Sequence, residues 1–152
     1  MSTEYYNLVC DLHGPANNAI IPDGQGALEG SFAYLVAFAG TTVLCGGGAL
    51  ELGLVASYEQ MVIDAEIHRT IHRALEGFEV SDSTLGMDTI IRVGVGGNYL
   101  LEDHTLQYLR HEKYFSPLLN PQVRDTWISQ GSKDLTQRAR ERARKMLVEH
   151  HP

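Results

Sequence analysis

The chain has 152 residues, of which 43% are hydrophobic and 20% charged, so it can form a core and is not expected to be disordered. Its formal net charge of −7 argues against a general nucleic-acid binder, because such proteins need a basic surface. The longest apolar run, residues 32–44, is too short for a membrane span of roughly 20 residues, and the first ten residues do not resemble a signal peptide. The two cysteines are consistent with reduced thiols, so we expect a cytoplasmic protein.

Strand and helix alternate in the first half of the chain. Residues 5–10 predict a short strand because aromatic and β-branched side chains dominate them, and residues 11–25 have the Gly, Pro and Asn content of a loop. A helix is expected over residues 27–39. Residues 41–45 predict a second strand, which three glycines at residues 46–48 end. This order predicts that the two strands are parallel neighbours joined by the helix.

The second half is expected to be helical. Ser57 and Gln60 have the spacing of a capping box, in which Ser57 caps a helix and the Gln60 side chain reaches back to it. That helix is expected to end at Gly77. Further helices are expected over residues 83–92, 102–112 and 125–130, with a break at residues 94–97 and a turn at residues 116–121.

A last helix is expected to be capped by Ser132. It carries the basic part of the chain, since residues 1–131 hold 6 basic and 16 acidic residues whereas residues 132–152 hold 6 and 3. This end could contact a phosphate or an acidic partner, although a solvated helix face is the simpler interpretation. The apolar stripe of this helix is predicted to consist of Leu135, Ala139, Met146 and Leu147.

Two strands cannot form a stable parallel sheet alone, because such sheets need more strands and cover on both faces. The chain is therefore expected to be a single partial α/β domain over residues 1–152. A strand–helix–strand–helix segment occupies residues 1–78, and a helical extension occupies residues 79–152.

Candidate binding residues lie in the loops that follow the two strands, because such loops carry the chemistry of α/β folds. Polar side chains beside a triple glycine favour a site where a ligand approaches the backbone. Simple turn formation by Asn, Asp and Gly is the alternative. No catalytic residue is assigned. The candidates for substrate binding are His13, Asn17, Gln25, Gly47, Glu51 and Tyr58.

Metal binding has weak support in the sequence. Asp64, His68 and His72 share one helix face, but Arg69 stands where the H-E-x-x-H zinc signature has Glu, so we interpret the face as solvated. A second set at the strand ends consists of Cys10, His13 and Cys45. Small buried cysteines at strand ends are more common than metal ligands, so no metal site is predicted.

Several segments, in order from about residue 12 to the end, resemble the trimethylamine methyltransferase family. Residues 21–29 are similar to its P-D-x-Q-x-x-x-E stretch, residues 48–54 to its G-x-L-E-x-G-x segment, and residues 57–67 to its S-Y-E-Q-x-V-x-D-x-E-I segment. Residues 97–110 and 131–141 resemble the segments near its C-terminus. The family is a (β/α)8 barrel that transfers a methyl group from methylated amines to the Co(I) centre of a separate corrinoid protein.

The resemblance implies the fold class. A full barrel needs about 250 residues, so the chain is expected to be the C-terminal portion of a (β/α)8 TIM-type barrel, with two parallel βα units followed by a helical tail. Family members specific for trimethylamine carry pyrrolysine, which is absent here, and relatives without it demethylate quaternary amines such as glycine betaine. The chain would be either the product of a region downstream of a stop codon read as pyrrolysine or a truncated pyrrolysine-free relative.

The resemblance also implies the function. We expect part of a methyltransferase that binds no cofactor directly, meets a corrinoid protein and a methylated amine, and is inactive as an isolated fragment. A non-catalytic interaction or assembly protein is the alternative. Attack of Co(I) on a methyl group of a quaternary ammonium would expel a neutral tertiary amine, which needs no proton, so no general acid is required. Tyr58 would face the cation, and His13, Asn17 or the amides of residues 46–48 would hold a remote carboxylate. Unpaired strand edges predict a homo-oligomer.

Overall fold

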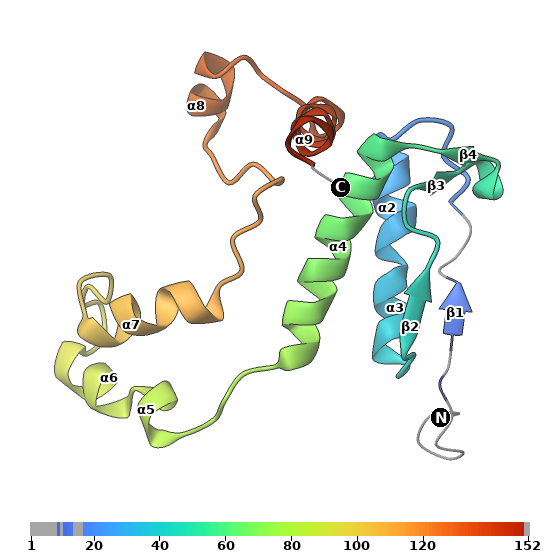
Figure 1. Cartoon of the computed structure of the whole chain (residues 1–152). Helices are drawn as coiled ribbons and strands as arrows, with labels where there is room; N and C mark the ends of the chain where they lie inside the picture. Colours follow the sequence, from blue (N-terminus) through green and yellow to red (C-terminus); the bar gives the residue numbers. More distant parts are fainter. Residues whose placement is uncertain (1–8, 10, 14–16, 151–152) are drawn as a thin grey trace. The chain divides into compact units, whose positions relative to one another are not determined.

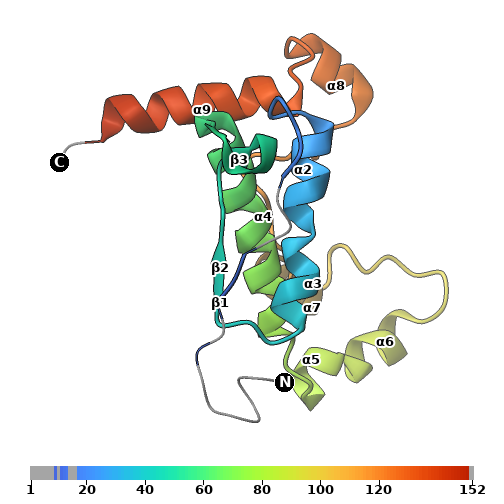
Figure 2. The same cartoon turned by 90° about the vertical axis from the view of Figure 1, so that its right-hand side faces the viewer.

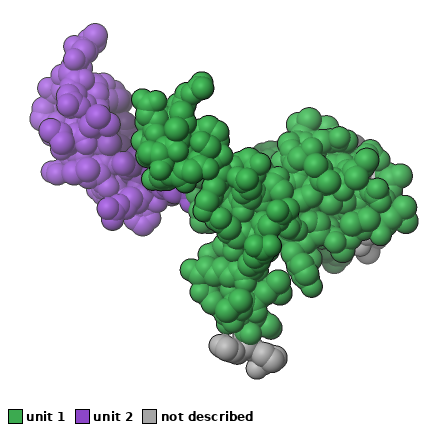
Figure 3. Space-filling model, turned by 90° about the horizontal axis from the view of Figure 1, so that it is seen from above, with its two compact units in different colours: residues 1–72, 116–152 green, residues 73–115 purple. Residues whose placement is uncertain are grey.

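The computed structural model describes residue 9, the backbone of residues 11–13 and residues 17–150. The chain forms two compact units (Figure 3). The first unit contains residues 1–72 and 116–152, and the second contains residues 73–115. The units cut across the predicted segments 1–78 and 79–152, because the C-terminal residues pack with the first part of the chain.

The first unit contains a parallel pair of strands, β1 (Asp11–His13) and β2 (Val43–Cys45) (Figure 1). Asp11 pairs with Val43, and His13 pairs with Cys45. A parallel pair with a helical crossover was predicted, and the pairing confirms it. The first strand, however, lies within residues predicted as a loop, and Val9 is outside it, while the rest of the predicted strand 5–10 is outside the described residues. Hydrogen bonding to β2 fixes the extended backbone here, although Asp is depleted in strands.

The crossover contains two helices, α2 (Gly24–Ser31) and α3 (Ala33–Phe38), where one helix over residues 27–39 was predicted. The two helices meet at Phe32, where the backbone forms a 3-10 turn: Phe32 N donates to Glu29 O, three residues earlier, at 3.1 Å. α2 begins earlier than predicted because the Asp23 side chain caps it and accepts hydrogen bonds from Gln25 N and Gly26 N.

The long helix α4 (Tyr58–Glu76) confirms the helix predicted after Ser57. Ser57 Oγ accepts from Gln60 N at 3.2 Å, as predicted for the cap. The prediction for the Gln60 side chain is wrong: it turns into the interior and bonds to α2 and α4, because burial there offers it stronger partners than the exposed cap. α4 runs beside α2 and α3 (Figures 1 and 2).

The loop between β2 and α4 contains a small antiparallel hairpin that was not predicted. Strands β3 (Ala49–Leu50) and β4 (Val55–Ala56) pair across the short 3-10 helix η1 (Glu51–Gly53). Strands of two residues fall below the length that alternation of side chains can reveal.

The second unit contains α5 (Asp82–Leu85), α6 (Met87–Val93) and α7 (Asp103–Glu112). A single helix over residues 83–92 was predicted, but Gly86 adopts the left-handed conformation with φ 59° and divides it. A Cβ at Gly86 would lie 2.7 Å from His104 Nε2, so the close approach of that side chain also requires glycine.

The remaining helices, α8 (Arg124–Ser129) and α9 (Leu135–Glu149), belong to the first unit. Asp134 caps α9 and forms a capping box with Gln137, so the predicted cap Ser132 is wrong. α9 lies across the amino-terminal end of α4 (Figure 2). Within the described residues, no helix combines the length and apolar character of a membrane span.

Two apolar clusters form the core of the first unit. Ala33 and Ala37 of α3 pack on Ile71 of α4. Leu118 and the fully buried Ala139 of α9 pack on Ile63, which also belongs to α4. α4 therefore joins the strand–helix part of the unit to the C-terminal helix.

Candidate functional site

The loops that follow β1 and β2 start at the same edge of the strand pair, since His13 and Cys45 are register partners at the strand ends. Backbone bonds join the two loops directly. Glu51 N donates to Ala19 O at 3.1 Å, and Leu52 N donates to Asn17 O at 2.9 Å. Glu51 and Leu52 both have positive φ, 47° and 57°, which indicates that these contacts hold a strained turn in place.

A network of buried polar groups connects both loops to helices α2 and α4. Asn17 Nδ2 and Gln60 Nε2 each donate to the carbonyl oxygen of Gly26 at 3.1 Å. Gln60 Nε2 also donates to Asp64 Oδ1 at 2.8 Å, and Asp64 Oδ2 accepts from Gly48 N at 2.8 Å. The network thus runs from the first loop through α2 and α4 to the glycine loop after β2.

The electrostatics of this network centre on Asp64, whose side chain lies in the interior. Burial raises the pKa of the Asp64 carboxyl above its usual value, while the hydrogen bonds from Gly48 and Gln60 and the charge of His68 oppose this rise. Gln60 is 0% exposed, and its Oε1 has no hydrogen-bond partner among the described residues. Both residues are therefore sensitive to any change of charge or volume nearby.

Two glycines of α2 allow this polar face of α4 to come close. A Cβ at Gly26 would lie 2.5 Å from Gln60 Oε1, and a Cβ at Gly30 would lie 2.5 Å from Asp64 Oδ1. Any side chain at either position would displace the network.

The residues predicted in the two loops have different surroundings. His13 ends β1, and its side chain is outside the described residues. Asn17 is 8% exposed and holds the first loop. Gln25 lies on α2, where its Nε2 donates to Glu29 Oε1 at 2.7 Å.

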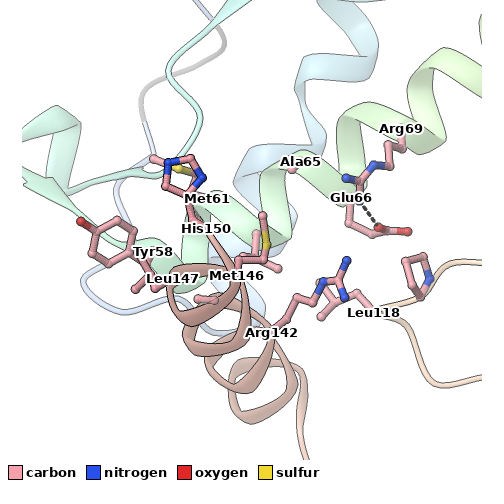
Figure 4. A pocket seen from close by; sticks show the side chains of 13 residues that line it. Tyr58, Met61, Ala65, Glu66, Arg69, Leu118, Arg142, Met146, Leu147 and His150 are labelled. Carbon is pink, nitrogen blue, oxygen red and sulfur yellow. Dashed lines mark hydrogen bonds and ion pairs between the residues drawn. The ribbon is translucent and has the colours of Figure 1, made fainter. Parts of the chain in front are cut away.

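The candidates after β2 lie further along the chain. Gly47 is in the glycine loop. A Cβ at this position would lie 3.9 Å from the Cβ of Asp64. Glu51 begins η1. Tyr58 is the first residue of α4, is 61% exposed and lines a hollow between α4 and α9 (Figure 4).

The structure changes the interpretation of the metal candidates. Asp64 is buried rather than solvated, while His72 on the same helix is exposed. Among the described residues no three His, Cys, Asp or Glu side chains gather as a metal site. Cys10 and the side chain of His13 lie outside these residues, so the set at the strand ends is not described.

Sequence reasoning missed the roles of Gln60 and Asp64. A usable signal was present in two pairs of equal spacing, Gly26 with Gly30 and Gln60 with Asp64, each four residues apart. Such spacing places both members of a pair on one helix face. A small face on one helix and a polar face on the next predict close packing with buried hydrogen bonds.

Comparison with known proteins identifies the family. The model of the trimethylamine methyltransferase (MTTB) family matches residues 3–152. The chain belongs to the trimethylamine methyltransferase family. It is 39% identical over 150 residues to a trimethylamine methyltransferase of Desulfitobacterium hafniense and 36% identical over 149 residues to one of Methanosarcina thermophila. These matches cover 98% and 97% of the chain.

A more distant relative has another substrate in its name. The glycine betaine methyltransferase of Desulfitobacterium hafniense strain Y51 is 27% identical over 150 residues, which cover 97% of the chain and 31% of that relative. The chain spans 30% of the length of both trimethylamine methyltransferases above.

Proposed function

We propose that this member of the trimethylamine methyltransferase family supplies the C-terminal part of an enzyme that moves a methyl group from a methylated amine to the Co(I) corrinoid of a separate protein. The observation that carries the proposal is the identity of 39% over 98% of the chain to a trimethylamine methyltransferase. The chain matches 30% of that relative, so the proposal includes inactivity of the isolated chain. In the same proposal, β1 and β2 are adjacent strands of a (β/α)8 barrel.

We propose trimethylamine as the substrate of this enzyme, with glycine betaine as the alternative. The reason is the higher identity to relatives named for trimethylamine, 39% and 36%, than to the one named for glycine betaine, 27%. Both substrates present methyl groups on nitrogen, and the binding surface must accept a cationic nitrogen, as trimethylammonium or as the quaternary nitrogen of glycine betaine.

The proposed reaction places simple demands on the chain. The C–N bond of the cationic substrate would break with its electron pair remaining on nitrogen, which would leave a neutral amine. The methyl group would pass to the partner's Co(I), which would supply the electron pair of the new bond. The positive charge of the substrate fades as the methyl group leaves, so a carboxylate at the nitrogen would stabilise the ground state more than the transition state. An aromatic face holds the cation more weakly.

The loops at the strand ends are the proposed binding surface. Tyr58, which is 61% exposed, would present its ring to the cation, and His13 with the amide of Gly47 would orient the substrate. Gln25 and Glu51 would line the entrance. Asn17 is already bonded to Gly26 O, so its proposed part is to position the first loop.

A chimera tests the proposal. The 30% of the Desulfitobacterium hafniense trimethylamine methyltransferase that matches the chain is replaced by residues 1–152. Methyl transfer is followed by the absorbance of methylcobalamin on a corrinoid protein with reduced cobalt. We expect transfer from trimethylamine by the chimera and none by the isolated chain. A folded chimera that uses neither trimethylamine nor glycine betaine contradicts the proposal.

An interaction or assembly protein derived from the family is the second candidate. It is favoured by apolar side chains on the surface of the first unit, among them Leu28 and Leu35, which are 62% and 71% exposed. A stable complex formed by the chain, together with an inactive chimera, would favour this candidate.

A further inference from the structure

A groove lies between α4 and α9 in the first unit, with a cavity volume of about 430 Å³ (Figure 4). One face of each helix lines it. Met61 of α4 and Met146 and Leu147 of α9 are 49%, 50% and 57% exposed. The groove is thus an apolar surface that the described residues leave open to solvent.

The geometry of α9 explains why the groove stays open. Among the described residues, the hydrogen bonds from α9 to distant segments of the unit lie in its first half: Thr136 Oγ1 donates to Pro22 O at 2.6 Å, and Arg140 Nε donates to Glu59 Oε1 at 2.9 Å. The Arg140 hydrogen bond holds the pKa of Glu59 below its usual value. The residues of α9 that line the groove begin at its middle, from Arg142 onward.

The charges beside the groove are mainly positive. α9 carries five basic and two acidic residues, in a chain whose formal net charge is −7. Arg142 lines the groove and forms no ion pair within the described residues. Glu66, the acidic lining residue, is 3% exposed and pairs with Arg69 at 3.2 Å. The groove therefore offers an unpaired cation beside methionine and leucine side chains.

The shape favours an elongated occupant. The lining residues of α4 extend from Tyr58 to Arg69, which spans about 16 Å at the helical rise. Three turns of a partner helix have this length, and such helices bind grooves through apolar anchors at one-turn spacing. Methionines at both walls suit this mode of binding because their side chains adapt to irregular surfaces.

We propose that the groove between α4 and α9 binds an amphipathic helix of another protein, with apolar side chains on one face and Asp or Glu beside them. The apolar face fills the cavity, and an acidic side chain pairs with Arg142. The charge of the groove selects an acidic helix over a basic one. This inference goes beyond the proposed function and needs neither substrate nor corrinoid.

A labelled peptide tests the proposal. The probe is a four-turn helical peptide with Leu at one-turn spacing and Glu on both sides of the Leu stripe, and its matched control carries Lys in place of Glu. Fluorescence anisotropy with the 152-residue chain is expected to show binding of the Glu peptide and about tenfold weaker binding of the Lys peptide. In wild-type protein, the methyl resonances of Met61 and Met146 are expected to shift with the Glu peptide.

Variants locate the binding surface. Arg142→Glu and the groove-filling Ala65→Trp are each expected to weaken Glu-peptide binding about tenfold. Arg144→Glu makes the same charge change on α9 outside the groove lining, and it is expected to change affinity by less than about twofold. Circular dichroism checks that all variants are folded.

Each other outcome overturns the proposal in a recognisable way. Equal binding of the two peptides removes the argument from charge. Unshifted methionine resonances in the wild type remove the groove as the site. A dimer that Ala65→Trp converts to a monomer assigns the groove to a second copy of the chain. Binding of oleate without binding of the Glu peptide assigns it to a small anionic amphiphile.

Discussion

Among single residues, Asp64 has a larger structural role than the sequence predicted, because it links separate segments of the first unit. Its two carboxylate oxygens accept from different segments, Gly48 N and the Gln60 side chain. The spacing with His68 and His72 led to the interpretation of a solvated face. Helical spacing identifies residues that share a face, but whether that face meets water or another helix depends on the glycines of α2, which lie far away in the sequence.

Replacing Asp64 by Asn is expected to destabilise the first unit by about 1–3 kcal/mol at neutral pH, because an amide offers one acceptor where two donors need one each. Urea unfolding followed by the fluorescence of Trp127, the single tryptophan of the chain, measures the effect. Glu79→Gln, at an exposed loop position, is the control and is expected to change stability by less than about 0.5 kcal/mol. Equal stability of D64N and wild type would show that the carboxylate contributes nothing.

The pH dependence has a definite sign. The folded-state pKa of Asp64 is raised above its ordinary value of 3.8, so between the two values the folded state binds more protons than the unfolded state. The part of the stability that comes from proton binding by Asp64 is therefore fully present below pH 3.8 and is lost as pH rises through the folded pKa, whereas the hydrogen bonds that Asp64 accepts from Gly48 and Gln60 are a separate contribution. Urea midpoints from pH 3 upward are expected to show wild type losing stability relative to D64N. A constant difference across this range would contradict the assignment.

At the scale of elements, periodicity and capping residues predicted most helices, including α4, α7 and α9. The errors occur where one residue alters the path of the chain. Gly86 divides a predicted helix because its left-handed conformation accommodates His104. β1 lies in a predicted loop because pairing with β2, not side-chain propensity, makes these residues extended.

Close packing of α2 on α4 leads to a prediction about glycine. Gly30→Ala improves helix propensity by about 1 kcal/mol, yet its Cβ would lie 2.5 Å from Asp64 Oδ1. We expect net destabilisation of about 1–2 kcal/mol from the displaced network, measured by thermal unfolding. Gly24→Ala in the same helix is the control, since a Cβ there meets nothing within 4 Å. A more stable G30A variant would show that α2 can move away from α4 at little cost.

At the scale of the whole molecule, the alternation of strand and helix predicted the parallel pair and the resemblance predicted the family, which the comparisons confirm. The division into two units was beyond prediction. It depends on Leu118 and Ala139 returning to Ile63, and contacts between positions more than fifty residues apart leave no periodic trace. The binding role of the loops and the barrel remain predictions.

The described sheet of β1 and β2 has two strands, and Leu35 and Phe38 of α3 are 71% and 61% exposed. We therefore expect the isolated chain to self-associate, because these surfaces gain by being covered. Light scattering at micromolar concentration is expected to give a mass above 16.8 kDa, and Leu35→Glu is expected to lower it. Ile91→Glu, a change at a 75% exposed position of the second unit, is the control. A monomer of 16.8 kDa would show that the chain covers its own core.

The contact between α2 and α4 also has a consequence for how sequences of this kind can diverge. The space for a side chain at position 30 is taken by the carboxylate of Asp64, and the space at position 26 by the amide of Gln60. A larger residue on one helix is therefore compatible with the fold after a smaller or reoriented residue appears on the other. These four positions are expected to change in pairs across an alignment, with glycine lost from α2 in those sequences that have also lost the polar pair from α4.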